Sequence, residues 1–453
     1  MNMAPTRGPA GSSAEVRAAA RGTFTEDLYA KLVNDEDARV CTDISDEACR
    51  ETPGSFLLIL ISNALTKLGD ALASPKTLLP WMATSIGVPA WVIGLLVPLR
   101  ESGSLLPQLL IGGFVRGLER RKWVWVAGSV VQGVAVACLA LTALTLTGRA
   151  AGYAVLACVM VFSLARGFCS VASKDVLGKT VPRSRRGQLN GWSSSAAGLV
   201  TVTLAAGLLV LGGFEGLGEF YVPMLFCAAA LWFLGALIFA RINEFPGETQ
   251  GGANAMSEAI GRLSILWSDP PFGRFVLARA LLMCSALSAP YYVLIAQQQH
   301  GSLPALLALF LLSAGLADLV SGPVWGRIAD TSSRRVMAVA AGLSSATGIA
   351  LVLLSTWTPR ALQPLVVVPL FYFVLSIAHA GVRVGRKTYV VDLASGNRRT
   401  DYVAVSNTVI GVLLLVVGSL GALTPLLGVS GVLLVLAAMG LSGAILCLTL
   451  EDT

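Results

Sequence analysis

The chain has 453 residues, of which 55% are hydrophobic and 13% are charged, and its formal net charge is +7. Soluble domains carry roughly 25% charged residues, so the composition excludes an ordinary soluble protein. The lysines and arginines stand at the ends of apolar segments, which is typical of membrane topology rather than of a nucleic-acid-binding surface. We therefore expect an integral protein of the lipid bilayer with no nucleic-acid partner, no cofactor and no metal.

Twelve apolar segments follow an N-terminal tail. A run of ~20 apolar residues is long enough to cross the ~30 Å hydrocarbon core of a bilayer as a helix. Lys67 and Asp70 interrupt the first segment. The pattern predicts an all-α polytopic membrane protein with twelve transmembrane helices, at about 55–79, 90–114, 123–147, 151–175, 190–213, 219–240, 273–298, 303–326, 336–356, 363–387, 402–425 and 428–449.

The loops between these segments carry their basic residues mainly on one side of the membrane. Sixteen lysines and arginines fall on that side, against only Arg149 and Arg360 on the other. Because the side richer in Lys and Arg is cytoplasmic, both termini are expected in the cytoplasm and the protein in the plasma membrane, which is the inner membrane in a bacterium. The sixteen are Arg116, Arg120, Arg121, Lys122, Lys179, Arg183, Arg185, Arg186, Arg241, Arg262, Arg274, Arg327, Arg334, Arg335, Arg398 and Arg399.

The longest loop after the tail divides the segments into six and six. The predicted domains are a cytoplasmic tail (1–54), an N-terminal six-helix half (55–240), a cytoplasmic linker (241–272) and a C-terminal six-helix half (273–453). In the tail, Phe24, Leu28 and Leu32 recur at helical spacing, so this stretch is either a short amphipathic helix or a polar tail. Six of the eight cysteines lie in apolar segments, and their spacing predicts no disulfide framework.

The two halves repeat each other at a nearly constant offset. Arg120-Arg121 falls on Arg334-Arg335 at a shift of 214, Arg166 falls on His379 at 213, and Pro75 falls on Pro290 at 215. Matched pairs of arginine in corresponding loops are improbable by chance even in so apolar a composition. The sequence therefore predicts two copies of one six-helix unit.

A glycine followed by an acidic position and paired arginines marks the loop after the second helix of each half. The second copy has Gly326, Asp330, Arg334 and Arg335, and the first has Gly112, Arg116, Glu119, Arg120 and Arg121. With this motif and the repeat, the chain resembles the major facilitator superfamily over about residues 55–450. The resemblance implies two six-helix halves that rock and a cytoplasmic gate at this motif. Arg116 replaces the expected acid, so a gate in the first half depends on Glu119; these arginines could also serve only to set topology.

Nine ionisable residues lie inside the predicted helices and away from their ends. Each costs ~2.5–3.5 kcal/mol on insertion scales, so each is a candidate for substrate binding or proton coupling. We expect Asp70 to pair with Arg100 and Lys67 with Glu101, which would equally suit a network that only locks two helices together. Lys174, Arg386 and Lys387 are near helix ends and are read as interfacial anchors. The nine candidates are Lys67, Asp70, Arg100, Glu101, Arg166, Arg279, Asp318, His379 and Arg383.

The repeat places a basic group at matched positions of the fourth and tenth helices. In the resembled family, helices one, four, seven and ten line the central cavity, which would put Arg166 and His379 there. His379 and Arg383 are four residues apart and share one helix face. His379 is expected to contact substrate or protons, although a histidine in a packed helix can also be purely structural. The excess of basic groups favours an anionic or zwitterionic solute, and Asp70, Glu101 and Asp318 are candidate proton carriers.

These features predict a secondary transporter, a monomer, that moves a small anionic or zwitterionic solute by alternating access with protons as coupling ion. It is not expected to be an enzyme. Two alternatives keep the same fold: a lipid or amphiphile transporter with an apolar lining, or a drug exporter. Two others change the class: a membrane-embedded enzyme built on His379, or a receptor that uses the tail.

Overall fold

The computed structural model describes residues 46–107, 111, 114–115, 117–210, 220–246, 263–329, 332–393 and 397–451. The amphipathic stretch predicted in the tail and most of the linker lie outside these residues. All regular secondary structure in the described part is helical, which confirms the all-α fold. Each of the twelve predicted segments coincides with a helix or a broken helix, and nine described helices are long and apolar enough to cross a membrane, which is consistent with twelve spans.

The N-terminal half is built from seven membrane-depth helices preceded by one short helix. Lys122, at the start of α8, follows the loop that carries the first copy of the arginine motif. Apolar runs of membrane length explain the long helices. In chain order they are α3 (Asp46–Arg50), α4 (Thr52–Leu72), α5 (Leu78–Ser85), α6 (Ala90–Leu105), α8 (Lys122–Thr145), α9 (Gly148–Thr180), α10 (Arg183–Val210) and α11 (Tyr221–Ala240).

The C-terminal half repeats this order of helices. Proline stands in the first turn of α14, α16 and α21, where its missing N–H removes no helical hydrogen bond. The elements are α13 (Ile265–Ser268), α14 (Pro270–Leu281), α15 (Cys284–Leu287), α16 (Ala289–His300), α17 (Pro304–Ala329), α18 (Ser333–Trp357), η1 (Pro359–Leu362), α19 (Val367–Asp392), α20 (Asn397–Gly418), η2 (Ser419–Leu423) and α21 (Thr424–Leu448).

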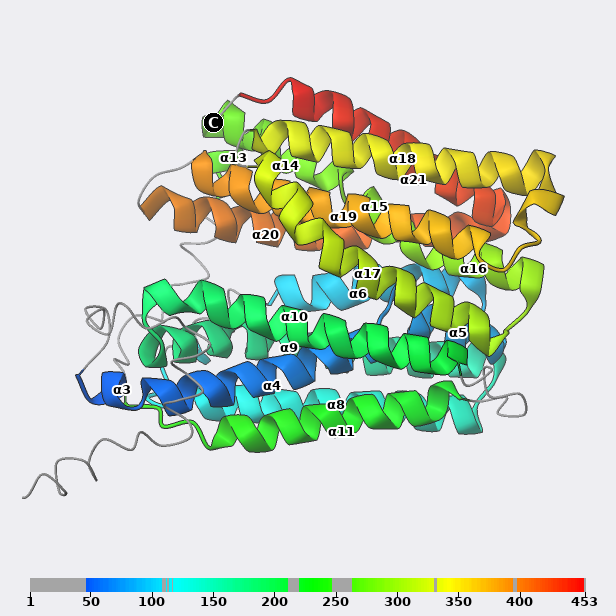
Figure 1. Ribbon diagram of the computed structural model, residues 1–453. Coiled ribbons are helices and arrows are strands. Elements are labelled where there is room, and N and C mark those ends of the chain that lie inside the picture. Colours follow the sequence, from blue (N-terminus) through cyan, green and yellow to red (C-terminus); the bar gives the residue numbers. More distant parts are fainter. Residues whose placement is uncertain are drawn as a thin grey trace, which may run out of the picture.

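The two halves lie one above the other in Figure 1, with their helices roughly parallel to the long dimension of the molecule. We call the end where α4 begins and α21 ends the termini end, and the opposite end the distal end. A single buried apolar cluster joins the halves and includes Trp81 and Phe162 from one and Tyr292 and Phe310 from the other. Two further clusters, around Phe56 and around Phe272, each belong to one half only.

The halves touch closely at the distal end. The Gln297 Nε2 atom donates to the backbone carbonyl oxygen of Trp81 at 3.3 Å, and the hydroxyls of Ser85 and Ser302 are 3.0 Å apart. A Cβ added to Gly421 of η2 would lie 3.0 Å from Cα of Gly94 in α6, so the two backbones meet there without side chains between them. These contacts seal the distal end of the interface.

The first and seventh membrane segments are broken, which the sequence did not predict. The first divides into α4 and α5 at residues 73–77, not at Lys67 or Asp70, and the seventh divides into α14, α15 and α16. Pro75 lies within the first break, and Pro290 lies directly after the second break, in the first turn of α16. The matched prolines therefore mark breaks at equivalent places in the two halves. Interrupted helices expose backbone and side-chain polar groups at membrane depth, a feature of binding sites in transporters.

Cys49 in α3 is disulfide-bonded, contrary to the absence of disulfides predicted from spacing. Its partner lies outside the described residues. Six cysteines are free, and they are the six in the apolar segments.

Candidate functional site

Three helices of the N-terminal half bring one carboxylate between two guanidinium groups. Arg100 Nη2 of α6 donates to Asp70 Oδ1 of α4 at 2.6 Å, and Arg166 Nη1 of α9 donates to Oδ1 at 2.6 Å and to Oδ2 at 2.5 Å. The Arg100 guanidinium also stacks over the Phe162 ring, 4.5 Å from its centroid. The Arg100 side chain is 8% exposed, that of Asp70 21% and that of Arg166 37%. The carboxylate thus balances charge that would be costly to bury alone.

The predicted Asp70–Arg100 pair is confirmed, while the participation of Arg166 was not foreseen. The ion pairs among the described residues do not include one between Lys67 and Glu101, so this predicted pair is not formed. Glu101 interacts with Lys76, Arg100, Arg166 and Arg386, whereas Lys67 interacts with Asp70, Lys387 and Arg383. Lys76, in the break after α4, supplies a positive charge near the acid that the sequence assigned to Lys67.

The C-terminal half repeats this arrangement with different chemistry. The Ser285 hydroxyl of α15 lies 3.1 Å from His379 Nδ1 of α19. Ser285 stands 215 positions after Asp70, which is the offset that matches Pro75 to Pro290. His379 stands 213 positions after Arg166, as the repeat predicts. The contact between serine and histidine is therefore the structural counterpart of the contact between carboxylate and guanidinium.

His379 also joins the two halves. Its Nε2 atom lies 2.9 Å from Nζ of Lys76, which belongs to the N-terminal half. Lys76 is not among the predicted site residues, because its Ser-Pro-Lys-Thr stretch lies at the end of the first predicted span. The Ser-Pro pair was the available signal of a turn in that span.

Basic side chains from both halves lie within electrostatic range of one another. Lys67 interacts electrostatically with Lys387 and Arg383 across the interface. Lys387 in turn interacts with Arg386 and with Lys174 of the other half. Lys174, Arg386 and Lys387, which the sequence places near helix ends as interfacial anchors, are thus also members of one electrostatically linked group. We name this group the basic cluster: Lys67, Lys174, Arg383, Arg386 and Lys387.

Two predicted residues of the C-terminal half take different positions. Arg383 Nη2 donates to Asp318 Oδ1 of α17 at 3.2 Å, and both side chains are well exposed, at 46% and 65%. Arg279 of α14 donates instead to neutral groups of α20, to Ser406 Oγ at 2.7 Å and to Asn407 Oδ1 at 2.8 Å. The Arg279 guanidinium therefore ties two helices of one half together.

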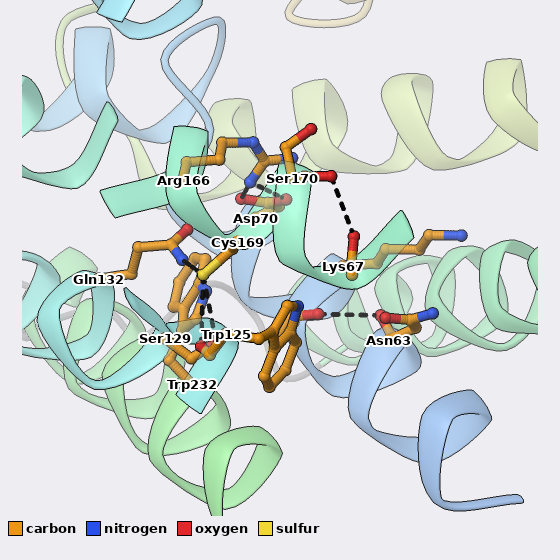
Figure 2. Close-up of a pocket in the computed structure, with 12 residues that line it drawn as sticks. Asn63, Lys67, Asp70, Trp125, Ser129, Gln132, Arg166, Cys169, Ser170 and Trp232 are labelled. Atoms are coloured by element: carbon orange, nitrogen blue, oxygen red, sulfur yellow. Dashed lines mark hydrogen bonds and ion pairs between the residues drawn. The ribbon is translucent and has the colours of Figure 1, made fainter. Parts of the chain in front are cut away.

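A cavity of about 230 Å³ opens within the N-terminal half, between α4, α8, α9 and α11. The Asp70–Arg166 pair forms one wall, while Trp125 and Trp232 lie opposite, and the Lys67 side chain extends away from the ion pair (Figure 2). Most of the remaining lining is polar. The lining residues are Asn63, Thr66, Lys67, Asp70, Trp125, Ser129, Gln132, Arg166, Cys169, Ser170, Ser173 and Trp232.

At the termini end, Glu244 takes the place of the acid missing from the first motif. Its fully buried carboxylate accepts from the backbone N–H groups of Arg121 and Lys122, at 3.0 and 2.7 Å, and from Lys179 Nζ at 3.0 Å. A carboxylate at a helix N-terminus satisfies free N–H groups and opposes the helix dipole, so Glu244 anchors the start of α8. It follows α11 in the predicted linker, where a polar residue indicates a solvated position rather than a buried one.

Two of the predicted gate arginines, Arg121 and Arg334, bond within their own half. Arg121 Nη1 pairs with Asp175 Oδ2 of α9 at 3.1 Å, within one half. Arg334 Nη1 donates to the backbone carbonyl oxygen of Leu450 at 2.7 Å, also within one half. Glu119 and Arg120 are exposed, and Arg335 lies in the first turn of α18. Gly112, Arg116, Asp330 and the surroundings of Gly326 lie outside the described residues.

Within the described ranges, no group of three or more His, Cys, Asp and Glu side chains is placed to hold a metal ion. The side chains of the site are suited to binding charged groups. Cations from both halves can bind an anion, while Asp70, Glu101, Asp318 and His379 are groups able to exchange protons.

Comparison with known proteins gives a family and a fold. A family model described as Major Facilitator Superfamily matches residues 59–412, whereas no curated protein matches the chain in sequence. A D-xylose-proton symporter matches in structure with a TM-score of 0.66 and 12% identity, over 88% of this chain and 97% of that one. A POT family transporter in complex with 5-aminolevulinic acid gives 0.66 and 11%, over 87% and 95%. The nucleoside transporter NupG gives 0.60 and 15%, over 87% and 98%.

Proposed function

Since the chain belongs to the major facilitator superfamily, we propose that it is a secondary transporter for a small organic anion or zwitterion, coupled to protons. The observation that carries this proposal is the basic cluster, in which lysines and arginines of both halves interact across the interface. The two six-helix halves act as the moving units, and the solute binds between them.

Like charges held together at membrane depth favour a ligand of opposite sign. Lys67 and Lys387 repel each other, and the acid nearest to Arg383 is the solvent-exposed Asp318. A carboxylate or phosphate placed between the halves would offset this repulsion, and the planar guanidinium of arginine suits bidentate capture of either group. A lipid or amphiphile would instead require an apolar lining, which this cluster does not provide.

The interface also supports alternating access. The halves share an apolar core and close backbone contacts at the distal end, while toward the termini end each half has a core of its own. A rocking motion would open the first region and close the second. A solute bound at the basic cluster would then be exposed to each side in turn.

A binding screen followed by uptake tests the proposal. We expect organic anions, but not their neutral analogues, to raise the melting temperature of the purified protein, as a ligand that binds only the folded state must. The stabilising anion should accumulate in proteoliposomes and do so faster with an inward proton gradient. Arg383→Gln should weaken its binding ~10-fold or more, equivalent to ~1.4 kcal/mol.

The matched control is Arg360→Gln, an exposed arginine of η1 at the distal end, outside the basic cluster. It should bind the anion as the native protein does. Equal loss of binding in both variants, or stabilisation by neutral solutes alone, would contradict the proposal.

We also propose that the termini end faces the cytoplasm, that the protein acts as a monomer and that it resides in the plasma membrane. The bias of basic loop residues, sixteen to two, supports this orientation. The disulfide at Cys49 is more typical of an oxidising compartment. The loop charges carry more weight for the orientation, because they act on every span during insertion. A reporter fused after Thr453 tests whether the C-terminus faces the cytoplasm.

A further inference from the structure

We propose that the contact between Lys76 and His379 is a proton-binding site that tethers the two halves and is released when the histidine takes up a proton. The proposal rests on the alternating-access function proposed above and names the residues through which a proton would act on it. It starts from one hydrogen bond that crosses the interface, 2.9 Å long, between Lys76 Nζ and His379 Nε2.

The neighbouring hydrogen bonds assign the tautomer of the histidine. The Ser285 hydroxyl donates to the backbone carbonyl oxygen of Leu282 at 3.0 Å, so its oxygen is left to accept from Nδ1–H of His379 at 3.1 Å. In a neutral imidazole with the proton on Nδ1, Nε2 carries the lone pair. The Lys76 ammonium, which can only donate, therefore has an acceptor in this tautomer alone.

A second proton makes this contact impossible. When His379 binds a proton at Nε2, both ring nitrogens become donors and the imidazolium has nothing to accept with. Two cations then face each other at hydrogen-bond distance, so Lys76 must move away. Nδ1–H can keep its bond to Ser285, which means that the change falls on the bond between the halves and spares the bond within one half.

The surrounding charges provide an alternative partner for the released lysine. Glu101 of α6 is the strongest charged neighbour of Lys76 and belongs to the same half. Other charged groups near the pair are Asp318 of α17, which attracts Lys76, and Arg383 and Arg386 of α19, which oppose positive charge on either Lys76 or His379. Movement of Lys76 toward Glu101 would replace a contact between halves with one inside the N-terminal half.

The same charges link the proton to the proposed solute. Arg383 and Arg386 oppose an added positive charge on His379. An anion bound at the basic cluster would offset that opposition, and by linkage each ligand would favour the binding of the other. The proton and the anion would therefore be expected to enter the site together.

Amide hydrogen exchange of the protein in lipid nanodiscs tests the tether without any substrate. In the native chain, lowering the pH from about 8 to about 4, a range that extends below the ordinary titration of histidine, should increase exchange in peptides from α5 and α16 at the distal end. His379→Gln should abolish this increase, because its amide oxygen can accept from Lys76 and its N–H₂ can donate to Ser285 at every pH. The same peptides in this variant also supply the intrinsic pH dependence of exchange.

Two further variants complete the test. Lys76→Met removes the donor and should raise exchange in α5 and α16 at both pH values. His300→Gln alters the only other histidine, whose Nε2 lies 2.9 Å from the backbone carbonyl oxygen of Leu362 within the same half, and should respond to pH as the native chain does.

A native protein without the pH response, or a His379→Gln variant that keeps it, would overturn the proposal. Unchanged exchange in peptides from α8 and α11, which pack on the side of the N-terminal half away from the interface (Figure 1), verifies folding in each variant. Because no solute is used, failure of the anion screen leaves this result standing, and a failed tether leaves the anion proposal standing.

Discussion

Asp70→Asn is expected to destabilise the N-terminal half strongly, because it removes the carboxylate that two arginines share. The substitution preserves shape but leaves the guanidiniums of Arg100 and Arg166 without the carboxylate that bonds to both, although Glu101 still interacts with them at longer range. Breaking a buried ion pair from one side costs ~3–5 kcal/mol. We take ~3 kcal/mol, since Arg166 is 37% exposed and water will screen part of the repulsion, while Arg100 is only 8% exposed.

The same chain offers a control of identical chemistry in a different environment. Asp318 and Arg383 also form a carboxylate–guanidinium pair, but their side chains are 65% and 46% exposed and 3.2 Å apart. Exposed pairs contribute ~0–1 kcal/mol. Asp318→Asn should therefore change stability little, although it removes the same charge.

Thermal unfolding of the purified variants measures the difference. For a unit of the size of one half, ~1 kcal/mol shifts the melting temperature by ~2–4 °C, so Asp70→Asn should melt ~6–12 °C below the native protein. Adding Arg100→Met to Asp70→Asn should recover part of this loss, because removing both partners of a buried pair is less harmful than removing one. Equal melting of the two single variants, or no recovery in the double variant, would refute the reasoning.

Two other substitutions are expected to act at the ends of the molecule. Glu244→Gln should lower the melting temperature by an amount equivalent to ~2–4 kcal/mol, since it removes a buried charge that accepts three hydrogen bonds, whereas Glu119→Gln at an exposed position should not; similar melting of both would contradict this. Gly421→Val should open the distal end, because its Cβ would lie 3.0 Å from Cα of Gly94, and overpacking costs ~1–3 kcal/mol. Hydrogen exchange of α5 should rise in this variant and not in Gly342→Val, whose Cβ meets nothing within 4 Å; equal exchange would count against a sealed interface.

The parts of the site that could be predicted from the sequence are those governed by periodicity. The offset of the repeat places Arg166 and His379 at equivalent positions, and the structure gives them equivalent partners. The spacing of Asp70 and Arg100 within the first two spans correctly indicates an ion pair. Both inferences depend only on where a residue lies along a helix of known length, which hydropathy determines well.

The parts that could not be predicted depend on a local break or on burial. Lys76 reaches His379 because the first span is interrupted at residues 73–77, and hydropathy averaged over a span does not detect five residues of turn. Glu244 is polar, follows a span and reads as solvated linker, yet its side chain is fully buried. Whether a charged residue near a membrane end faces water or a buried donor is decided by tertiary packing, which no single segment contains.

The repeat also shows how the two halves divide their roles. One half keeps a charged pair, Asp70 with Arg166, whose members compensate each other inside that half. At the equivalent position the other half has Ser285 and His379, which need no counter-ion and leave the imidazole free to bond across the interface to Lys76. The first arrangement suits a fixed anchor and the second a contact that can be made and broken. Loss of Asp70 should therefore appear mainly as lost stability, and loss of His379 mainly as a lost response to pH.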